Sequence, residues 1–237
     1  MKFLITYLFL LFCLSFQAQT SFRDSSLPIE ERVDLLISQM TIDEKISQLM
    51  SDAPAIKSLG IPKYDWWNES LHGVARAGYA TVFPQSISIA ASWDKNLLHE
   101  VATAISDEAR AKHHEYARRG QHDIYQGLTM WSPNINIFRD PRWGRGHETY
   151  GEDPYLTGQL GLNFVKGLQG DHSKYLKTVA TAKHFAVHSG PEASRHTFDV
   201  YPSERDLWET YLPAFRTLVK DAQVSSIMTA YNRFRGE

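Results

Sequence analysis

Groups of polar side chains follow three apolar segments of this 237-residue sequence, each at the point where the segment ends. In an α/β barrel, the C-terminal ends of the strands carry the reactive groups. Amines, imidazoles, amides and phenols all exchange hydrogen bonds with hydroxyl groups. The pattern therefore predicts a shared site for a hydroxyl-rich ligand; the alternative is that each group only caps its own strand. The groups are Lys183-His184 after Val179 to Ala182, Tyr231-Asn232 after Ile227 to Ala230, and Asn134 to Asp140 after the segment through Met130 and Trp131.

The loop from Asn136 to Pro154 is dense in Arg, Asp, Glu, Trp and Gly. Guanidinium groups form forked hydrogen bonds to carboxylates or to paired hydroxyls, and Trp rings stack on the apolar faces of sugars. These residue types favour carbohydrate recognition. The alternative is a buried ionic network that stiffens the loop and accounts for part of its charges, including Arg139, Asp140 and Glu148.

A second stretch with the same character runs from Tyr64 to Val74 and places Glu69 beside Trp66 and Trp67. A carboxylate next to aromatic faces is typical of a carbohydrate subsite. The alternative is that both tryptophans belong to the core and that Glu69 only starts a helix.

Other chemistries find little support in the sequence. There are ten histidines but no HExxH motif and no pair of cysteines, and the adjacent His113 and His114 would diverge by ~100° on a helix. No GxSxG motif is present either. We therefore predict neither a metal site nor a cofactor, and no serine or cysteine nucleophile.

Charge and composition narrow the choice of partner. The 25 basic and 27 acidic residues are interspersed and give a net charge of −2, so no extended field favours nucleic acid or an anionic membrane. A neutral small molecule fits better. With 43% hydrophobic residues, the chain can form one large domain or most of one, which we place at residues 21–237.

Residues 1–20 read as a secretory signal peptide, with Lys2, an apolar run from Phe3 to Phe16 and a short polar exit. A membrane anchor is the alternative, but this run is shorter than the ~20 residues that span a bilayer. A lipoprotein signal at Cys13 is disfavoured because Phe12 precedes it rather than a small residue. We predict a secreted or periplasmic protein without disulfides, because Cys13 is the only cysteine.

Helices are predicted where apolar residues recur at helical spacing, and some of these segments follow a capping signal. Thr41 and Glu44 have the spacing of a capping box, with Ile46, Leu49 and Met50 expected on the buried face of that helix. The other helices are expected from Pro28 to about Met40, from Asp94 to about Arg118, from Asp153-Pro154 through Leu168, and from Ser203 to Lys220 with a kink or restart at Pro213.

Strands are predicted for residues 128–137, 178–185 and 225–231. Their alternation with helices predicts an α/β fold with a parallel sheet, either a barrel or an open doubly wound sheet. No GxGxxG turn follows a strand, which disfavours a dinucleotide-binding sheet.

At these motifs the sequence resembles the N-terminal barrel domain of glycoside hydrolase family 3, over nearly all of the chain that follows residue 20. The form Trp66-Trp67-Asn-Glu-Ser-Leu-His-Gly is most similar to the β-xylosidase branch of that family. The resemblance implies a TIM-like (β/α)8 barrel, incomplete on its C-terminal side. The motifs that carry it are Arg139-Asp-Pro-Arg-Trp-Gly-Arg145, Gly151-Glu-Asp-Pro154 and Ala182-Lys-His-Phe185.

The resemblance also implies roles for particular residues. Arg145, Lys183 and His184 would donate hydrogen bonds to hydroxyls of the terminal sugar, and Glu69 would accept from its outer hydroxyls. Met228 and Tyr231 would line the same subsite. Arg195 and His196 are weaker candidates for a further contact.

The family's nucleophile, an Asp in a Ser-Asp-Trp type motif, has no match in the sequence, and neither does the general acid/base Glu. Both are expected beyond Glu237, so no catalytic residue is assigned. The implied activity is removal of terminal β-D-xylosyl residues from oligosaccharides with retention of configuration. A β-glucosidase, or a protein that binds sugar without hydrolysing it, are the alternatives.

Overall fold

The computed structural model describes residues 21–237, so the predicted signal peptide lies outside the described residues. The chain divides into two units, and the boundary falls between Leu49 and Met50. The candidate site lies wholly within the second unit. Each unit is described on its own.

The first unit contains the helices α1 (Ile29–Gln39) and α2 (Ile42–Ser47). The capping box at the start of α2 is confirmed: Thr41 Oγ1 accepts from the Glu44 amide at 3.2 Å, and Glu44 Oε2 accepts from the Thr41 amide at 2.8 Å. Each of these two bonds satisfies an amide that the first turn leaves without a helical partner.

The expected burial of this helix is wrong. No residue of α1 or α2 is buried, and Ile46, Leu49 and Met50 are all exposed. Two helices of 11 and 6 residues offer too little apolar surface to enclose each other's faces. Their periodicity predicted the helices correctly but not a core.

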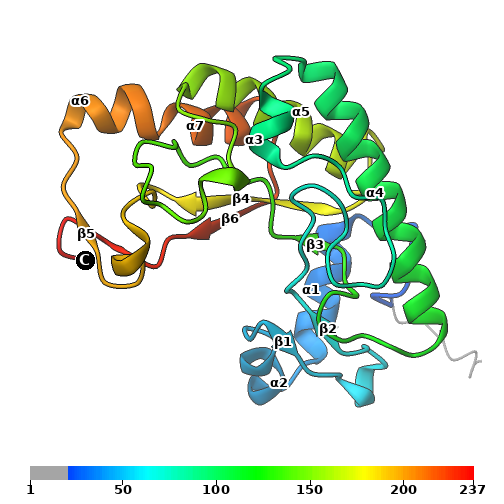
Figure 1. Ribbon diagram of the computed structural model, residues 1–237. Helices are drawn as coiled ribbons and strands as arrows, with labels where there is room; N and C mark the ends of the chain where they lie inside the picture. Colours follow the sequence, from blue (N-terminus) through cyan, green and yellow to red (C-terminus); the bar gives the residue numbers. More distant parts are fainter. Residues whose placement is uncertain (1–20) are drawn as a thin grey trace, which may run out of the picture. The chain divides into compact units, whose positions relative to one another are not determined.

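The second unit is built on a parallel sheet of three strands in the order β3-β4-β6 (Figure 1). These strands are β3 (Thr129–Met130), β4 (Val179–Phe185) and β6 (Ser226–Thr229). Thr129 pairs with Val179, and Lys183 pairs with Met228. The parallel α/β arrangement is confirmed, and residues 21–237 form no closed sheet.

The predicted strand at residues 128–137 is much shorter than expected. Pro133 has no amide hydrogen to donate, so the ladder cannot continue through it. The chain nevertheless stays beside β4, because the carbonyls of Ser132 and Pro133 accept from the amides of Thr181 at 2.9 Å and Lys183 at 3.1 Å. An isolated parallel bridge between Asn134 and Lys183 follows, where the Ile135 amide donates to the Lys183 carbonyl at 2.9 Å. This bridge brings the loop that follows β3 beside the C-terminal end of β4.

Two helices connect the three strands and cover one side of them (Figure 1). Helix α5 (Pro154–Gln169) lies between β3 and β4 in sequence, and α7 (Pro213–Lys220) lies between β4 and β6. Helix α4 (Lys95–Arg118) packs on α5. Asp153 caps α5 as predicted, through a bond to the amide of Leu156 at 2.5 Å. Asp94 caps α4 in the same way, through a bond to the amide of Leu97 at 3.0 Å.

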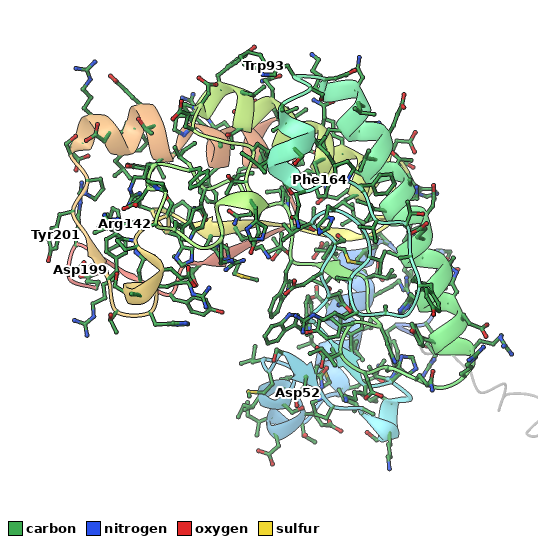
Figure 2. The ribbon with its side chains drawn as sticks, in the orientation of Figure 1. Asp52, Trp93, Arg142, Phe164, Asp199 and Tyr201 are labelled. Atoms are coloured by element: carbon green, nitrogen blue, oxygen red, sulfur yellow. The ribbon has the colours of Figure 1, made fainter. Side chains whose placement is uncertain are left out.

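The main core lies between these helices and the strands. Phe164 of α5 is only 1% exposed there (Figure 2). Glycines let the helices approach closely: a Cβ on Gly167 would lie 2.6 Å from the carbonyl oxygen of His99. Other buried members of this core are Leu98, Ala102, Ile105, Met130, Ile135, Leu160, Val165, Ala180, Ala182 and Leu218.

The predicted helix at 203–220 is interrupted, as expected from Pro213. It begins as α6 (Glu204–Asp206), widens into a π-helix at Leu207–Tyr211, and restarts as α7 with Pro213 as its first residue. A proline fits the first turn of a helix because no helical acceptor is available to its position.

Short elements complete the second unit. They are β1 (Asp52–Ala53) antiparallel to β2 (Tyr64–Asp65), α3 (Ser86–Ala90), β5 (Asp199–Val200) parallel to β7 (Arg233–Phe234), and 3-10 turns at Lys57–Leu59, Gly146–Glu148 and Glu192–Ser194. Among the helices of residues 21–237, none combines the length and apolar character needed to cross a membrane.

Candidate functional site

The site is centred on Lys183, near the C-terminal end of β4. The residue is only 2% exposed. Its ammonium group makes no hydrogen bond to the described residues 21–237 and still reaches solvent. Burial lowers the pKa of Lys183 to about 8, although the carboxylates of Glu148 and Glu69 act in the opposite direction. A buried cation with open donors is costly unless a ligand or solvent supplies acceptors.

Arg145 lies beside Lys183 and is held by a forked ion pair. Its Nε donates to Glu148 Oε1 at 2.7 Å and its Nη2 donates to Glu148 Oε2 at 2.6 Å. Burial opposes the charge of Arg145, but Glu148 outweighs it and raises the Arg145 pKa. Burial likewise disfavours the Glu148 carboxylate, yet Arg145 holds the Glu148 pKa below its ordinary value. Both side chains are therefore charged and fixed.

A 3-10 turn sets the spacing of this pair. Arg145 precedes the turn Gly146–Glu148, which places the two side chains three residues apart on one side. The turn rests on the ring of Phe138, so closely that a Cβ on Gly146 would lie 2.3 Å from the ring. Any other residue at this position would have to displace the Phe138 ring or the turn.

His184 is enclosed by Asn136, which follows the short β3 strand. Asn136 Oδ1 accepts from the His184 amide at 2.9 Å and lies 3.0 Å from His184 Nδ1. On the other side of the ring, His184 Nε2 lies 3.0 Å from Arg145 Nη1. Burial, and then the neighbouring cations Arg145 and Lys183, lower the pKa of His184, so the imidazole is neutral.

Aromatic rings extend from His184 toward Tyr231. The ring of His188 lies 4.6 Å from that of His184 and 6.1 Å from that of Tyr231, between centroids. Tyr231 also contacts the exposed His196 at 4.8 Å. The Nε2 of buried His188 has no hydrogen-bond partner among the described residues.

Glu69 faces the two cations from the loop after β2. Its carboxylate raises the pKa of both Arg145 and Lys183, which places it within electrostatic range of each. Trp67 Nε1 donates to Glu69 Oε1 at 3.0 Å, and the Trp67 ring stacks on Trp131 at 4.7 Å with an interplanar angle of 24°. The tryptophan pair thus orients the carboxylate and leaves Trp67 38% exposed.

The structure brings together Glu69, Arg145, Lys183 and His184 by hydrogen bonds or electrostatic interactions, in agreement with their predicted proximity. Tyr231 adds its ring contacts, and Met228 is half-buried and in register with Lys183 on β6. Arg195 instead pairs with Glu192 at 2.8 Å. The ligand that these residues bind is a matter of proposal.

The structure gives different roles to the three charged residues for which the sequence offered a loop-stiffening ionic network as the alternative. Asp140 pairs with Arg142 at 2.7 Å, and Arg139 lies over the rings of Phe198 and Tyr211, so both stabilise the loop. Glu148 holds Arg145 and therefore belongs to the site. Asn136 lies in the predicted polar group from Asn134 to Asp140, but it was not singled out as a site residue. The signal that could have found both is the motif itself, because Asn136 and Glu148 flank Arg139 to Arg145 closely.

A cavity of about 800 Å³ lies away from this site, at the N-terminal end of β4. In barrel folds that end of the strands serves stability rather than chemistry. Residues 21–237 contain no cluster of three His, Cys, Asp or Glu side chains arranged to hold a metal ion. The cavity is lined in part by His99, Lys166, Gln169, His172, Tyr175 and Lys177.

In α/β barrels the active site lies at the C-terminal ends of the strands and in the loops that follow them, and Lys183 is found near such an end here. Residues 36–237 match the model of the glycosyl hydrolase family 3 N-terminal domain. The chain therefore belongs to glycosyl hydrolase family 3.

Among curated proteins, the chain is 50% identical to a xylan 1,4-β-xylosidase of Xylanibacter ruminicola over 91% of its own length. It is 45% identical to a probable β-D-xylosidase of Arabidopsis thaliana over 90% of its length. The chain spans 26% and 29% of the lengths of these two relatives.

Solved structures give the same family. A GH3 exo-β-xylosidase in complex with a xylobiose aziridine probe superposes with a TM-score of 0.81 at 36% identity, over 92% of this chain and 29% of the other. A β-glucosidase of Kluyveromyces marxianus in complex with glucose gives 0.73 at 33% identity, over 86% and 23%.

Proposed function

We propose that the protein containing these residues is a retaining exo-β-xylosidase that removes terminal β-D-xylosyl residues from oligosaccharides. The similarity to curated xylosidases at 50% and 45% identity supports this choice within the family. The chain spans about a quarter of the length of the first of them, so the activity proposed is that of the longer protein.

One observation carries the proposal: Lys183 is only 2% exposed, yet its ammonium group has no hydrogen-bond acceptor among residues 21–237, reaches solvent and lies within electrostatic range of Arg145 and Glu69. Three open N–H groups on Lys183, together with those of Arg145 left over by Glu148, suit a ligand with several adjacent hydroxyls. Glu69 supplies an acceptor for hydroxyl protons on the same ligand. A terminal sugar offers donors and acceptors on neighbouring carbons in this way.

The residues described here hold the sugar and do not by themselves break the bond. Retaining hydrolysis needs two carboxyl groups about 5 Å apart, one as nucleophile and one as acid/base. Glu148 is committed to Arg145, and its lowered pKa makes it a poor proton donor. We therefore place the nucleophilic Asp and the acid/base outside these residues.

The test is hydrolysis of nitrophenyl β-xyloside by the full-length product of the gene, with proton NMR to follow the anomer released first. We expect the β-anomer, as retention requires. Release of the α-anomer would contradict the retaining mechanism. Absence of turnover on any aryl glycoside would contradict the enzyme assignment and favour a protein that only binds sugar.

A β-glucosidase is the second candidate, because similar solved structures include β-glucosidases. Xylose and glucose share three equatorial hydroxyls and differ by one hydroxymethyl group, so Glu69 alone discriminates weakly. The ratio of kcat/KM for nitrophenyl β-xyloside to that for nitrophenyl β-glucoside decides: a value below one would favour the glucosidase.

Two features of the longer protein belong to the same proposal. We propose that residues 1–20 direct its export and that β3, β4 and β6 form part of a closed (β/α)8 barrel. The order of the parallel strands and their connecting helices supports the barrel. N-terminal sequencing of the exported protein tests the first feature, and a structure of the longer protein tests the second.

A further inference from the structure

The connection between β4 and β5 runs beside the site. We call residues 189–198 of this connection the rim segment. Near its end, the ring of the exposed His196 lies 4.8 Å from the Tyr231 ring, between centroids. Burial does most to lower the pKa of His184, and the charge of Arg195 contributes to the same shift, so the Arg195 guanidinium lies within electrostatic range of that ring. The rim segment therefore borders the site next to Tyr231.

Glu192 joins the rim segment to the loop that leads into Arg145. Its Oε2 accepts from the backbone amide of Gly144 at 3.2 Å, and its Oε1 lies 2.8 Å from Arg195 Nη1. Its own backbone amide donates to the carbonyl of Arg142 at 3.2 Å. A single residue of the rim segment thus bonds to the loop through both its backbone and its side chain, and pairs with an arginine of its own segment.

The two segments approach each other closely at Gly144. A Cβ on Gly144 would lie 2.9 Å from Glu192 Cδ and Oε2 and 3.0 Å from Glu192 Cγ, and these are its three nearest heavy atoms. The backbone of Gly144 is outside the left-handed region, so the contact with Glu192 is what excludes a larger residue. Because Gly144 directly precedes Arg145, this contact is one residue away from a cation of the site.

Arg195 depends on Glu192 for its charge partner. The Arg195 side chain is 28% exposed, and its Nε is buried without a hydrogen-bond partner among residues 21–237. The ion pair at 2.8 Å supplies the negative charge that compensates this partly buried guanidinium. Loss of Glu192 would leave the guanidinium uncompensated, in a segment that has also lost its bond to Gly144.

We propose that Glu192 is a positioning residue that holds the rim segment against Gly144 and so sets the separation between Arg145 and the rim of the sugar site. The sugar part of this proposal rests on the proposed function, whereas the link between the two segments does not. A site whose binding groups are already in place loses less entropy when its ligand binds. This gain applies equally to the ground state and the transition state, so loss of Glu192 should raise KM and leave kcat nearly unchanged.

The first experiment measures kcat and KM of the full-length product on nitrophenyl β-xyloside. For Glu192→Ala we expect KM to rise about 3- to 10-fold with kcat within about twofold, because two partly exposed charged contacts are lost. Glu192→Gln keeps one acceptor oxygen and should fall between. Glu209→Ala is the matched control, since Glu209 is an exposed glutamate paired with Arg205 at 2.9 Å. An unchanged KM in Glu192→Ala would overturn the proposal.

The second experiment uses Gly144→Ala, which pushes the Glu192 side chain away without changing any charge. We expect it to raise KM in the same way as Glu192→Ala. In the double variant the space beside the new Cβ is free, because the nearest atoms belonged to Glu192. Its KM should therefore not exceed that of Glu192→Ala alone. Additive increases would mean that the two residues act independently, and would overturn the link.

Thermal unfolding of the same four proteins separates the possible failures. Non-additive changes in Tm support the link between Glu192 and Gly144, and additive changes overturn it. A lowered Tm in Glu192→Ala with an unchanged KM would make Glu192 a structural residue only. If the unchanged product neither hydrolyses nor binds a xyloside, the proposed function and the sugar part of this proposal both fail, and the Tm values alone decide on the link.

Discussion

At the scale of single residues, the polar groups of the site differ in how far their hydrogen bonds are satisfied within the protein. Glu148 and Arg145 satisfy each other in a forked pair, and Asn136 satisfies both faces of its amide. Lys183 is buried at 2% exposure with no acceptor among the described residues. A lysine buried to this degree, with open N–H donors beside the remaining N–H groups of Arg145, is the strongest indication that a ligand belongs there.

Replacement of Lys183 tests this reading. Lys183→Met keeps the length of the side chain and removes the charge, so we expect kcat/KM of the full-length product on aryl xylosides to fall by about 10- to 150-fold. Lys95→Met, at an exposed position in the first turn of α4, is the control. An unchanged rate in Lys183→Met would make Lys183 a structural residue.

The pKa of Lys183 also predicts a pH dependence. Burial lowers this pKa from 10.5 to about 8, so the ammonium loses its proton as pH rises through about 8. We expect xylose to bind more weakly above that pH, because a charged donor becomes a neutral one. Titration calorimetry from about pH 6 to about pH 9 measures it, and Lys183→Met should show no such change.

Stability should move in the opposite direction over the same window. Between about 8 and 10.5 the unfolded chain binds a proton at Lys183 that the folded chain does not. The contribution of this group to the free energy of unfolding therefore increases with pH. A loss of sugar binding above pH 8 that coincided with unfolding would contradict the assignment to Lys183.

At the scale of elements, the site depends on how closely α4 and α5 pack behind the sheet. Gly167 lies in that contact, and a Cβ there would meet the His99 carbonyl oxygen at 2.6 Å and the Ala102 Cβ at 2.7 Å. Backbone cannot rotate away as a flexible side chain can. The two helices would have to separate, and α5 leads directly to β4 and Lys183.

A pair of glycine substitutions in α5 tests this packing. Gly167→Ala should lower the free energy of unfolding by about 1–3 kcal/mol through overpacking. Gly158→Ala is the matched control, because its Cβ would lie 3.4 Å from the nearest atom, Thr217 Oγ1. It should be neutral or gain up to ~1 kcal/mol from helix propensity. Thermal and urea unfolding measure both, and equal effects would contradict the close approach of α4 and α5.

At the scale of the whole molecule, we expect the described residues to provide sugar recognition without a complete pair of catalytic carboxyl groups. We expect the 237-residue chain expressed alone to hydrolyse no glycoside even when folded. Glu148 is held by Arg145, which keeps its pKa below the ordinary value and makes it a poor proton donor to a leaving oxygen. Nitrophenol release by the chain, beside the full-length product, measures this. Turnover well above a buffer blank would place the chemistry on residues named here.

Local sequence was enough to determine the helices and the main strand of this protein. The caps at Thr41, Asp94 and Asp153 bond to amides within three residues, so their patterns are readable without a fold. The restart of the helix at Pro213 is likewise readable from local sequence, because proline lacks the amide hydrogen that a helix interior needs. Lys183 was identifiable as the end of a strand, since β4 carries an apolar run before it.

Only the tertiary structure decided which polar groups form hydrogen bonds with one another. Asn136 and His184 are 48 residues apart, and nothing in either segment shows that one amide will accept from two atoms of the other residue. The exposure of Ile46 and Leu49 could not be predicted either, because periodicity identifies an apolar face but not whether another element covers it. Hydrogen-bond partners and burial depend on distances between segments, and these are set only when the strands and helices pack.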